Sequence, residues 1–347
     1  MTDVDWKSTV CVLCYVNCGI EVTTADRTIT KVRGDKAHPG TRGYLCQKAQ
    51  RLPFYGRAED RLTSPLKRRA DGGFDAIDWD TAIGEIAARL GEVRESHGGE
   101  SIAFYGGGGQ GNHLGGPYGI GFVRALGCTS LYSSLAQEKT GDFWLNGHLF
   151  GSQICHTAEG IEDADLVIFL GANPSMAHGF RNARKELRTL SKDPDRHVIV
   201  IDPVRTETVD HADLHLQLAP GTDSYLLGAI LALLNQRGAL DQSFLAEHTT
   251  GSDEVLRRLD DIPIDDWIAH TGVPRADIER AVELIASAKA MSVRAELGVQ
   301  QGRHSTLNSY FEKLLFLLTG NFAAPESMGC IPGCNPCGAP RAAGVRR

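Results

Sequence analysis

The pattern of hydrophobic and polar positions predicts a small β-rich module at the start of the chain. Residues 19–23 and 28–32 alternate with period two around a turn at 25–26, which is typical of two antiparallel strands. This module is expected to end near residue 55. The stretch 61–75 that follows is polar, contains a proline and two adjacent glycines, and favours a loop.

The rest of the pattern predicts an α/β fold. Apolar positions from Ile83 to Val93 recur with helical spacing and indicate an amphipathic helix that opens near Trp79. Short apolar runs then alternate with helical patterns, as in a doubly wound fold whose parallel strands are covered on both faces. The strands are expected at 101–105, 166–170 and 197–201, and the helices at 181–190, 224–236, 275–288 and 307–318.

Composition narrows the class of protein. The 347 residues carry a formal net charge of -7, which argues against a general basic surface for nucleic acid. The longest strongly apolar run, 226–234, is far shorter than the roughly 20 residues that cross a bilayer. The first residues are acidic and show neither the basic patch nor the apolar stretch of a secretion signal, so a cytoplasmic location is expected.

Cysteine spacing predicts a metal centre in the first module. Cys11, Cys14 and Cys18 lie close together in sequence, and Cys46 follows after the predicted hairpin. Four thiolates suit either zinc or a cubane iron–sulfur cluster. Zinc sites usually present two close pairs, whereas three close cysteines and a distant fourth favour a [4Fe-4S] cluster. Four unrelated buried thiols are a poor explanation for three cysteines in one short polar loop.

The other cysteines are interpreted differently. Cys330, Cys334 and Cys337 have the spacing of a radical S-adenosylmethionine cluster loop, but too few residues follow them to build the barrel that such a loop needs. A chance occurrence in a tail explains them better, with metal capture by the tail as a weaker alternative. Cys128 and Cys155 are interpreted as small buried residues.

Three turns that follow predicted strands favour a dinucleotide-like ligand. Residues 170–174 lie between a strand and a helix, where backbone amides can face an anion. Asp202 ends the strand 197–201 and can accept hydrogen bonds from a ribose or a guanine. Residues 220–223 form a turn that opens a helix, with a threonine or aspartate cap. Each turn alone is also ordinary turn and cap chemistry.

The glycine-rich run at 106–116 is less informative. Gly106, Gly108 and Gly111 match G-x-G-x-x-G after a predicted strand, but neither a clear helix nor an acid about 20 residues further on completes the pattern. A nucleotide loop and a flexible loop under a ligand explain this segment equally well.

Taken together, these motifs resemble the molybdopterin guanine dinucleotide oxidoreductases, the family of formate dehydrogenases and periplasmic-type nitrate reductases. The resemblance extends to about residue 321. It implies a [4Fe-4S] cluster on the four cysteines of the first module, and a lysine between cluster and pterin, which Lys48 matches. It also implies a molybdopterin guanine dinucleotide that carries molybdenum or tungsten. The residues that match the family's cofactor-binding loops are Gly171, Asn173, Pro174, His178, Asp202, Arg205, Thr206, Thr208, Gly221, Asp223, Gln301 and His304.

Two features depart from the family. Where its members often have selenocysteine, cysteine or serine as the metal ligand, this chain has Lys139, and lysine is not a usual molybdenum ligand. Either the metal has no protein ligand here or the register differs. Family members are also much longer, and the likeness stops after the turn at 320–322. The segment from Cys330 onward is interpreted as a foreign or frame-shifted tail.

The expected domains follow from this resemblance. They are a [4Fe-4S] module at 1–57, the first part of an α/β domain at 58–150, a Rossmann-like cofactor domain at 151–290, a return segment of the first α/β domain at 291–325, and an atypical tail at 326–347.

The implied function is a formate dehydrogenase-like oxidoreductase that moves electrons between a molybdenum or tungsten pterin site and the cluster. A small-molecule substrate and a redox partner or complementing chain are expected. One alternative is a truncated, non-catalytic fragment that binds iron–sulfur and pterin. Another is a zinc-stabilised nucleotide-binding protein.

Overall fold

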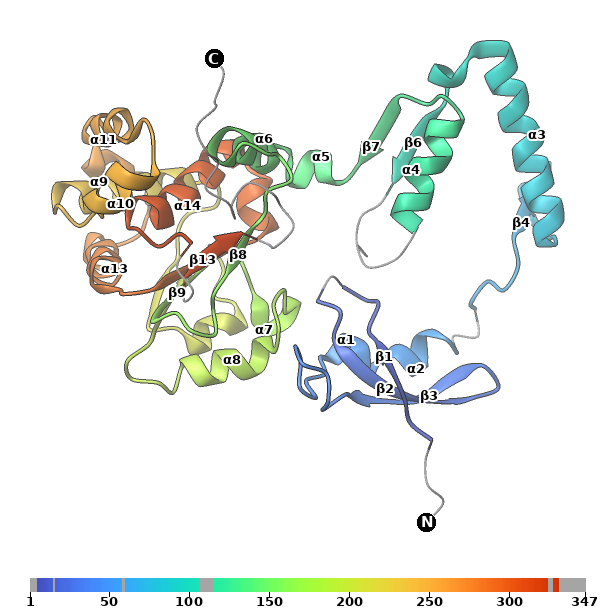
Figure 1. The fold of residues 1–347 in the computed structure, drawn as a ribbon, viewed down its shortest axis with the longest axis horizontal. Coiled ribbons are helices and arrows are strands. Elements are labelled where there is room, and N and C mark those ends of the chain that lie inside the picture. The colour runs from blue at the N-terminus through green and yellow to red at the C-terminus, as the bar shows by residue number, and fades with distance from the viewer. Residues whose placement is uncertain (1–4, 15, 58–59, 107–114, 324–326, 331–347) are drawn as a thin grey trace. The chain divides into compact units, whose positions relative to one another are not determined.

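The computed structural model describes residues 5–14, 16–57, 60–106, 115–323 and 327–330. The chain divides into two compact units, Met1–Ala136 and Gln137–Arg347, both drawn in Figure 1. None of the helices in the described part of the chain combines the length and apolar character that a membrane span needs.

The first unit begins with a three-stranded antiparallel sheet in the order β1–β2–β3. The strands are β1 (Lys7–Val10), β2 (Gly19–Ala25) and β3 (Thr28–Gly34), and the short helices α1 (Gln47–Gln50) and α2 (Leu52–Tyr55) follow. The hairpin of β2 and β3 confirms the predicted alternation. β1 is not foreseen because all four of its residues are exposed and leave no apolar alternation. The core of this module contains Cys11, Cys18, Ile20, Val22 and Ala49.

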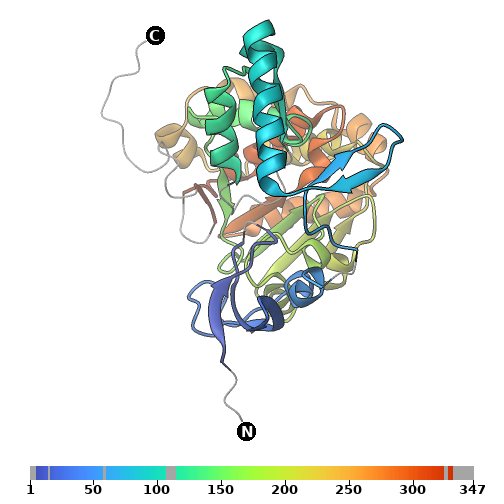
Figure 2. The ribbon, with the colours of Figure 1, turned by 90° about the vertical axis from the view of Figure 1, so that its right-hand side faces the viewer.

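The predicted loop at 61–75 is wrong in part. β4 (Leu66–Arg68) and β5 (Phe74–Ala76) form an antiparallel hairpin there, whose turn uses Gly72 at φ +86°. The amphipathic helix is confirmed as α3 (Trp79–His97), a single uninterrupted helix in Figure 2. The Asp78 carboxylate caps it by accepting the Thr81 N–H at 2.7 Å.

A parallel strand pair completes the first unit. β6 (Ala103–Gly106) confirms the strand predicted at 101–105, after a 3-10 turn η1 (Gly99–Ser101), and pairs with β7 (Ser130–Ser133). Between them in sequence lies α4 (Gly115–Ala125), so a helix does follow the glycine-rich run, contrary to expectation. Gly108 and Gly111 lie outside the described residues.

A four-stranded parallel sheet organises the second unit, in the order β11–β10–β9–β12. β9 (Leu166–Leu170) and β10 (His197–Ile201) are the two predicted apolar strands, and β11 (Leu214–Leu216) and β12 (Met291–Ala295) flank them. Every residue of β9 is buried, as expected for a strand that is covered on both faces.

Helices cover both faces of this sheet, which confirms the α/β class. Leu166, Ile168 and Leu170 of β9 pack into a large core with α9 (Asp223–Gln236), α13 (Arg275–Ser287) and α14 (Ser305–Leu318). Val167 and Phe169 point to the other face and pack on α8 (Ala183–Leu190). Figure 1 shows α8 on one side of β9 and the α9–α14 layer on the other.

All four predicted helices of this unit are confirmed within a few residues. Several shorter elements lack a strong period and are not foreseen. They are α5 (Leu135–Glu138), α6 (Thr140–Phe150), β8 (Thr157–Glu159), α7 (Pro174–Ala177), η2 (Glu207–His211), α10 (Gln242–His248), α11 (Ser252–Asp260), α12 (Ile264–Thr271), η3 (Leu297–Gln300) and β13 (Met328–Cys330).

Candidate functional site

The four cysteines of the first module are electrostatic neighbours. Burial, with a smaller contribution from the charges of Cys14 and Cys46, raises the pKa of the Cys11 thiol and raises that of Cys18 to about 11. The Cys11 N–H donates to the Cys18 carbonyl at 2.8 Å, which closes the loop that carries Cys14. Thiols that oppose one another's ionisation suit a shared metal centre, because bound iron stabilises all the thiolates at once.

The fourth cysteine reaches the other three through a loop that sequence reasoning missed. Thr41 is buried, and its hydroxyl accepts the Gly19 N–H at 3.1 Å, which ties the loop to the start of β2. A Cβ on Gly34 would collide with the Gly43 carbonyl, so this close approach needs glycine. Cys46 then stands at the N-cap of α1, and Lys48 lies half-buried within α1.

The spacing of the four thiols in the described part of the chain is wider than a single bound ion needs. Among the described residues, no three His, Cys, Asp or Glu side chains form a group that could hold a metal ion. Cys14 and Cys46 nevertheless act electrostatically on the buried thiols of Cys11 and Cys18, which groups all four cysteines in one partly buried loop system.

In the second unit, two of the predicted cofactor loops, those that follow β9 and β10, meet at the carboxyl ends of these strands. The Gly171 N–H donates to the Ile201 carbonyl at 2.8 Å, which places the two strand ends side by side. Asn173 donates to Glu207 and accepts from the Thr208 hydroxyl, both at 2.8 Å. The same hydroxyl accepts the N–H of Ser175 at 3.2 Å. The structure therefore brings Asn173 and Thr208 together, 35 positions apart in sequence.

Gly171 has two structural reasons to be glycine. Its φ of +56° is left-handed, and a Cβ there would lie 2.9 Å from Cγ1 of Val299 in η3. The backbone after β9 therefore packs directly against the segment that follows β12.

The same edge contains buried polar groups that the described protein atoms leave unpaired. The hydroxyl oxygens of Ser175, Thr206 and Ser224 are buried and have no hydrogen-bond partner among the described residues. Such groups are costly unless they are paired, and three of them beside two strand ends fit a polar ligand with several donors and acceptors. The loops therefore fit a nucleotide-like cofactor.

Two carboxylates lie near one another at this edge. Burial raises the pKa of Asp223, at the start of α9, and the charge of Asp202 at the end of β10 raises it further. Asp202 also accepts the Val204 N–H at 2.8 Å, which turns the chain after β10. The helix cap predicted at Thr222 or Asp223 is wrong, because neither side chain caps α9 and the Thr222 hydroxyl donates back to Ala219.

The other predicted cofactor residues are spread over several loops and turns. His178 is buried with φ +67°, and Pro174 is the first residue of α7. Arg205 is exposed and pairs with Asp210 at 3.1 Å. His304 is exposed, and its ring lies edge-on to that of Tyr225 on α9, 6.2 Å between centroids. The structure places the last two residues of the set, Gly221 and Gln301, in exposed turns without linking them to the rest.

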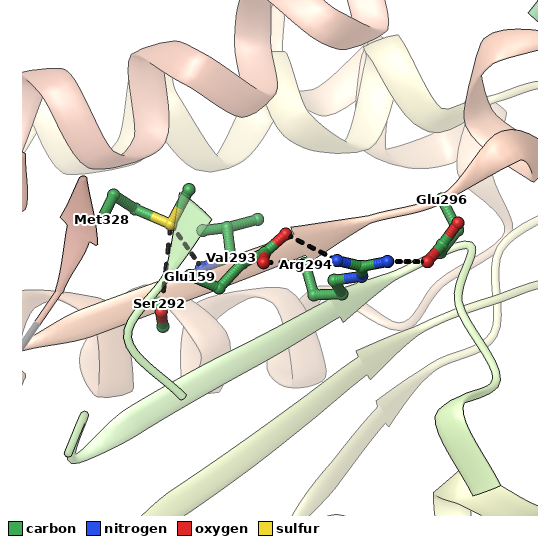
Figure 3. Close-up of polar contacts among 6 residues, drawn as sticks. All are labelled: Glu159, Ser292, Val293, Arg294, Glu296 and Met328. Atoms are coloured by element: carbon green, nitrogen blue, oxygen red, sulfur yellow. Dashed lines mark hydrogen bonds and ion pairs between the residues drawn. The ribbon is translucent and has the colours of Figure 1, made fainter. Parts of the chain in front are cut away.

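An arginine centre beside this edge was not anticipated (Figure 3). Arg294 on β12 donates to both carboxylate oxygens of Glu159 on β8, at 3.1 and 3.2 Å, and also pairs with Glu296. The sulfur of Met328 on β13 accepts the Val293 N–H at 3.3 Å. A side chain on Gly179 would meet both Arg294 and Glu296, so the loop after α7 packs on this centre.

The remaining predictions concern isolated residues. Cys128 and Cys155 are buried as expected, at 6% and 0% exposure. Cys330 ends β13, which pairs with β8, whereas Cys334 and Cys337 lie outside the described residues. Lys139 directly precedes α6 and lies beside Gln300 of η3.

Comparison with known proteins identifies the family. Residues 4–56 match the model of the molybdopterin oxidoreductase Fe4S4 domain, and residues 61–329 match that of molybdopterin oxidoreductase. The chain therefore belongs to the molybdopterin oxidoreductase family, whose cofactors are a [4Fe-4S] cluster and a molybdopterin that carries molybdenum or tungsten.

Curated relatives include enzymes of two activities. A nitrate reductase of Symbiobacterium thermophilum is 30% identical over 99% of this chain and 46% of its own length. F420-dependent formate dehydrogenase 1 subunit alpha of Methanococcus maripaludis is 27% identical over 96% of this chain and 48% of its own. The chain thus spans about half the length of the curated relatives that it matches.

A solved structure supports the fold. Acetylene hydratase from Pelobacter acetylenicus superposes with a TM-score of 0.78 at 23% identity, over 91% of this chain and 44% of the hydratase.

Proposed function

We propose that this chain is the cluster- and pterin-binding part of a formate dehydrogenase-like oxidoreductase. The observation that carries the proposal is the gathering of four cysteines, two of them buried, in the loops of one small module that matches an Fe4S4 domain. The proposed ligands of the [4Fe-4S] cluster are Cys11, Cys14, Cys18 and Cys46. Lys48 is the proposed electron-transfer residue, on the basis of its position two residues after Cys46.

The molybdopterin guanine dinucleotide is proposed to bind at the carboxyl ends of β9 and β10. The unpaired hydroxyls of Ser175, Thr206 and Ser224 offer hydrogen bonds to its phosphates and sugar. Asp202 and Asp223 offer carboxylate oxygens to N–H groups of a guanine. When bound, the metal of this cofactor supplies two-electron chemistry, and the cluster carries single electrons.

The finer assignments are part of the same proposal. They comprise the cluster module at 1–57 and the cofactor domain at 151–290, a small-molecule substrate, and a redox partner or complementing chain. The expected cytoplasmic location and the expected lack of nucleic-acid binding stay predictions from sequence.

A second candidate function is a non-catalytic module that binds the cluster and the pterin without turnover. One observation favours it: Lys139 stands where the resemblance places the family's metal ligand, and lysine is not a usual molybdenum ligand. Formate-dependent reduction of a dye by the purified chain would decide for the catalytic candidate. Bound pterin and metal without dye reduction would decide for the module.

Anaerobic purification of a matched pair of variants tests the cluster assignment. Cys46→Ala removes a proposed ligand, whereas Cys128→Ala removes a buried thiol whose Sγ donates to the Ile102 carbonyl at 3.0 Å. We expect Cys46→Ala to lose most of its iron, sulfide and visible absorbance, and Cys128→Ala to keep all three. Equal iron in both variants would refute the assignment, and zinc in place of iron would refute the cluster.

A further inference from the structure

The second unit contains a cavity of about 420 Å³ that shares no residue with the proposed cofactor loops. It is formed by α11, the connection 261–263, α12 and α14. Most of its lining is apolar or aromatic, and the side chains on which the argument depends are Val255, Leu259, Trp267, Tyr310, Phe311 and Leu314. A cavity of this size and lining is typical of sites for small molecules.

Two contacts with α9 hold the walls of the cavity in place. The Asn235 side chain, near the end of α9, donates to the Asp260 carboxylate at 2.8 Å and so fixes the end of α11. The Cε3–Cζ3 edge of the Trp267 ring on α12 packs on Gly228 of α9, where a Cβ would collide with it. The cavity is therefore preformed by the packing of the helices, as most small-molecule sites are.

Three aromatic rings follow one another along the cavity. The centroid of the Phe311 ring lies 6.3 Å from that of Trp267 and 6.1 Å from that of Tyr310. The Phe311 and Tyr310 rings are stacked, with 29° between their planes. A row of rings at such distances favours a planar aromatic ligand, which can stack on one ring and meet the edge of another.

Two donors at the cavity make no hydrogen bond with the described residues. The Trp267 N–H lies on the edge of the indole opposite the edge that packs on Gly228, and it has no acceptor in the described part of the chain. The Tyr310 hydroxyl also has none there, and burial raises its pKa, so it stays protonated at neutral pH. Because an indole N–H can only donate, the matching ligand carries an acceptor such as a carbonyl oxygen.

The charges at the cavity select against ions. Among the described residues that line it, Glu254 accepts from Arg258 Nε at 3.0 Å, and the two charges offset each other. Asp261 has no ion-pair partner in the described part of the chain, so two carboxylates and one guanidinium leave a net charge of −1. This charge opposes an anion, and an ammonium ligand has no acceptor to offer the Trp267 N–H.

We propose that this cavity is a second ligand site, which takes a neutral planar aromatic molecule with a carbonyl oxygen. The aromatic body of the ligand packs on Phe311 and its neighbouring rings, and the carbonyl oxygen accepts a hydrogen bond from the Tyr310 hydroxyl. The inference goes beyond the proposed function and does not depend on it, because no cluster or pterin residue contributes to the cavity.

Equilibrium dialysis of coumarin against the anaerobically purified full chain tests this inference. Coumarin is a neutral fused two-ring molecule with a carbonyl, and naphthalene is the matched ligand without one. We expect saturable binding of coumarin at one site per chain. Coumarin-3-carboxylate, which adds a negative charge, should bind more weakly than coumarin. Absence of saturable coumarin binding would overturn the proposal and leave the cavity to a side chain of a partner protein. A carboxylate that binds as tightly as coumarin would overturn the neutral class.

A conservative variant tests the hydrogen bond separately from the packing. Tyr310→Phe keeps the ring and should weaken coumarin binding about threefold to tenfold, while naphthalene binding stays within about twofold. Tyr225→Phe removes a hydroxyl from a ring that contacts Trp267 but does not line the cavity, and it should bind both ligands as the unaltered chain does. Coumarin binding that Tyr310→Phe leaves unchanged, or an equal loss for both ligands, would overturn the proposed contact.

A second variant tests the location. Val255→Trp places a larger side chain in the wall of the cavity and should abolish binding of both ligands without changing the circular dichroism or the iron content. Binding that survives in Val255→Trp would overturn the assignment of the ligand to this cavity. A chain that lacks iron and pterin but binds coumarin would contradict only the proposed function, so the two failures are distinguishable.

Discussion

The close approach of Gly171 to Val299 leads to a quantitative prediction. Gly171→Ala forces an alanine into a left-handed backbone at φ +56° and places its Cβ 2.9 Å from Cγ1 of Val299. The left-handed backbone costs about 1–2 kcal/mol for a residue other than glycine. Overpacking a buried contact adds about 1–3 kcal/mol, so we expect a loss of about 2–5 kcal/mol in the free energy of unfolding.

A matched glycine separates the two contributions. Gly272 has φ +70°, and a Cβ there would meet no atom within 4 Å. Gly272→Ala should therefore lose only the backbone part, about 1–2 kcal/mol. Urea unfolding followed by circular dichroism, with the slope m checked for constancy, measures both variants. Equal losses for Gly171→Ala and Gly272→Ala would refute the claim that the loop after β9 packs tightly on η3.

Three further predictions concern other sites. Arg294→Met leaves Glu159 and Glu296 without their shared cation, so it should lower the free energy of unfolding by about 2 kcal/mol and reduce hydrogen-exchange protection in β8. Arg280→Met, which removes an exposed pair with Glu283, should lower the free energy of unfolding by less than about 0.5 kcal/mol. Equal losses in the two variants would contradict this contrast. Burial raises the pKa of Asp223 above its ordinary 3.8 in the folded chain. The contribution of Asp223 to stability is therefore fully present below pH 3.8, and it is lost as the pH rises through the pKa of the folded state. The urea midpoint of Asp223→Asn should therefore rise relative to that of the unaltered chain when the pH is raised from about 4 to about 7. An equal difference between the two midpoints at both pH values would contradict this prediction. Lys313→Met should lower the free energy of unfolding by about 3–5 kcal/mol, because two buried carboxylates lose their cation. The triple variant Lys313→Met, Asp142→Asn, Glu312→Gln has no buried carboxylate left, so it should recover much of this lost stability. A triple variant as unstable as Lys313→Met would contradict the charge argument.

The parts of the fold that the sequence could predict are those with a strong period. The apolar run at 197–201 forms β10, one of the two central strands of the parallel sheet, and the stripe from Ile83 to Val93 forms α3, because these patterns match the strand and helix periods directly. β1 and the β4–β5 hairpin were missed since their residues are exposed and carry no apolar face.

The site divides in the same way. The spacing of Cys11, Cys14 and Cys18 is local, so sequence alone grouped them. Arg294 pairs with Glu159, 135 positions away, and Lys313 pairs with Asp142, 171 positions away. A local sequence pattern does not predict pairs so far apart. Pairings of this kind arise only when strands and helices are packed.

The metal and pterin content of the unaltered chain, purified without oxygen, tests the proposed cofactors most directly. We predict about four iron and four sulfide per chain, as a cubane requires, together with molybdenum or tungsten and a pterin that releases a guanine nucleotide on hydrolysis. A chain that contains zinc but neither iron nor pterin would contradict it.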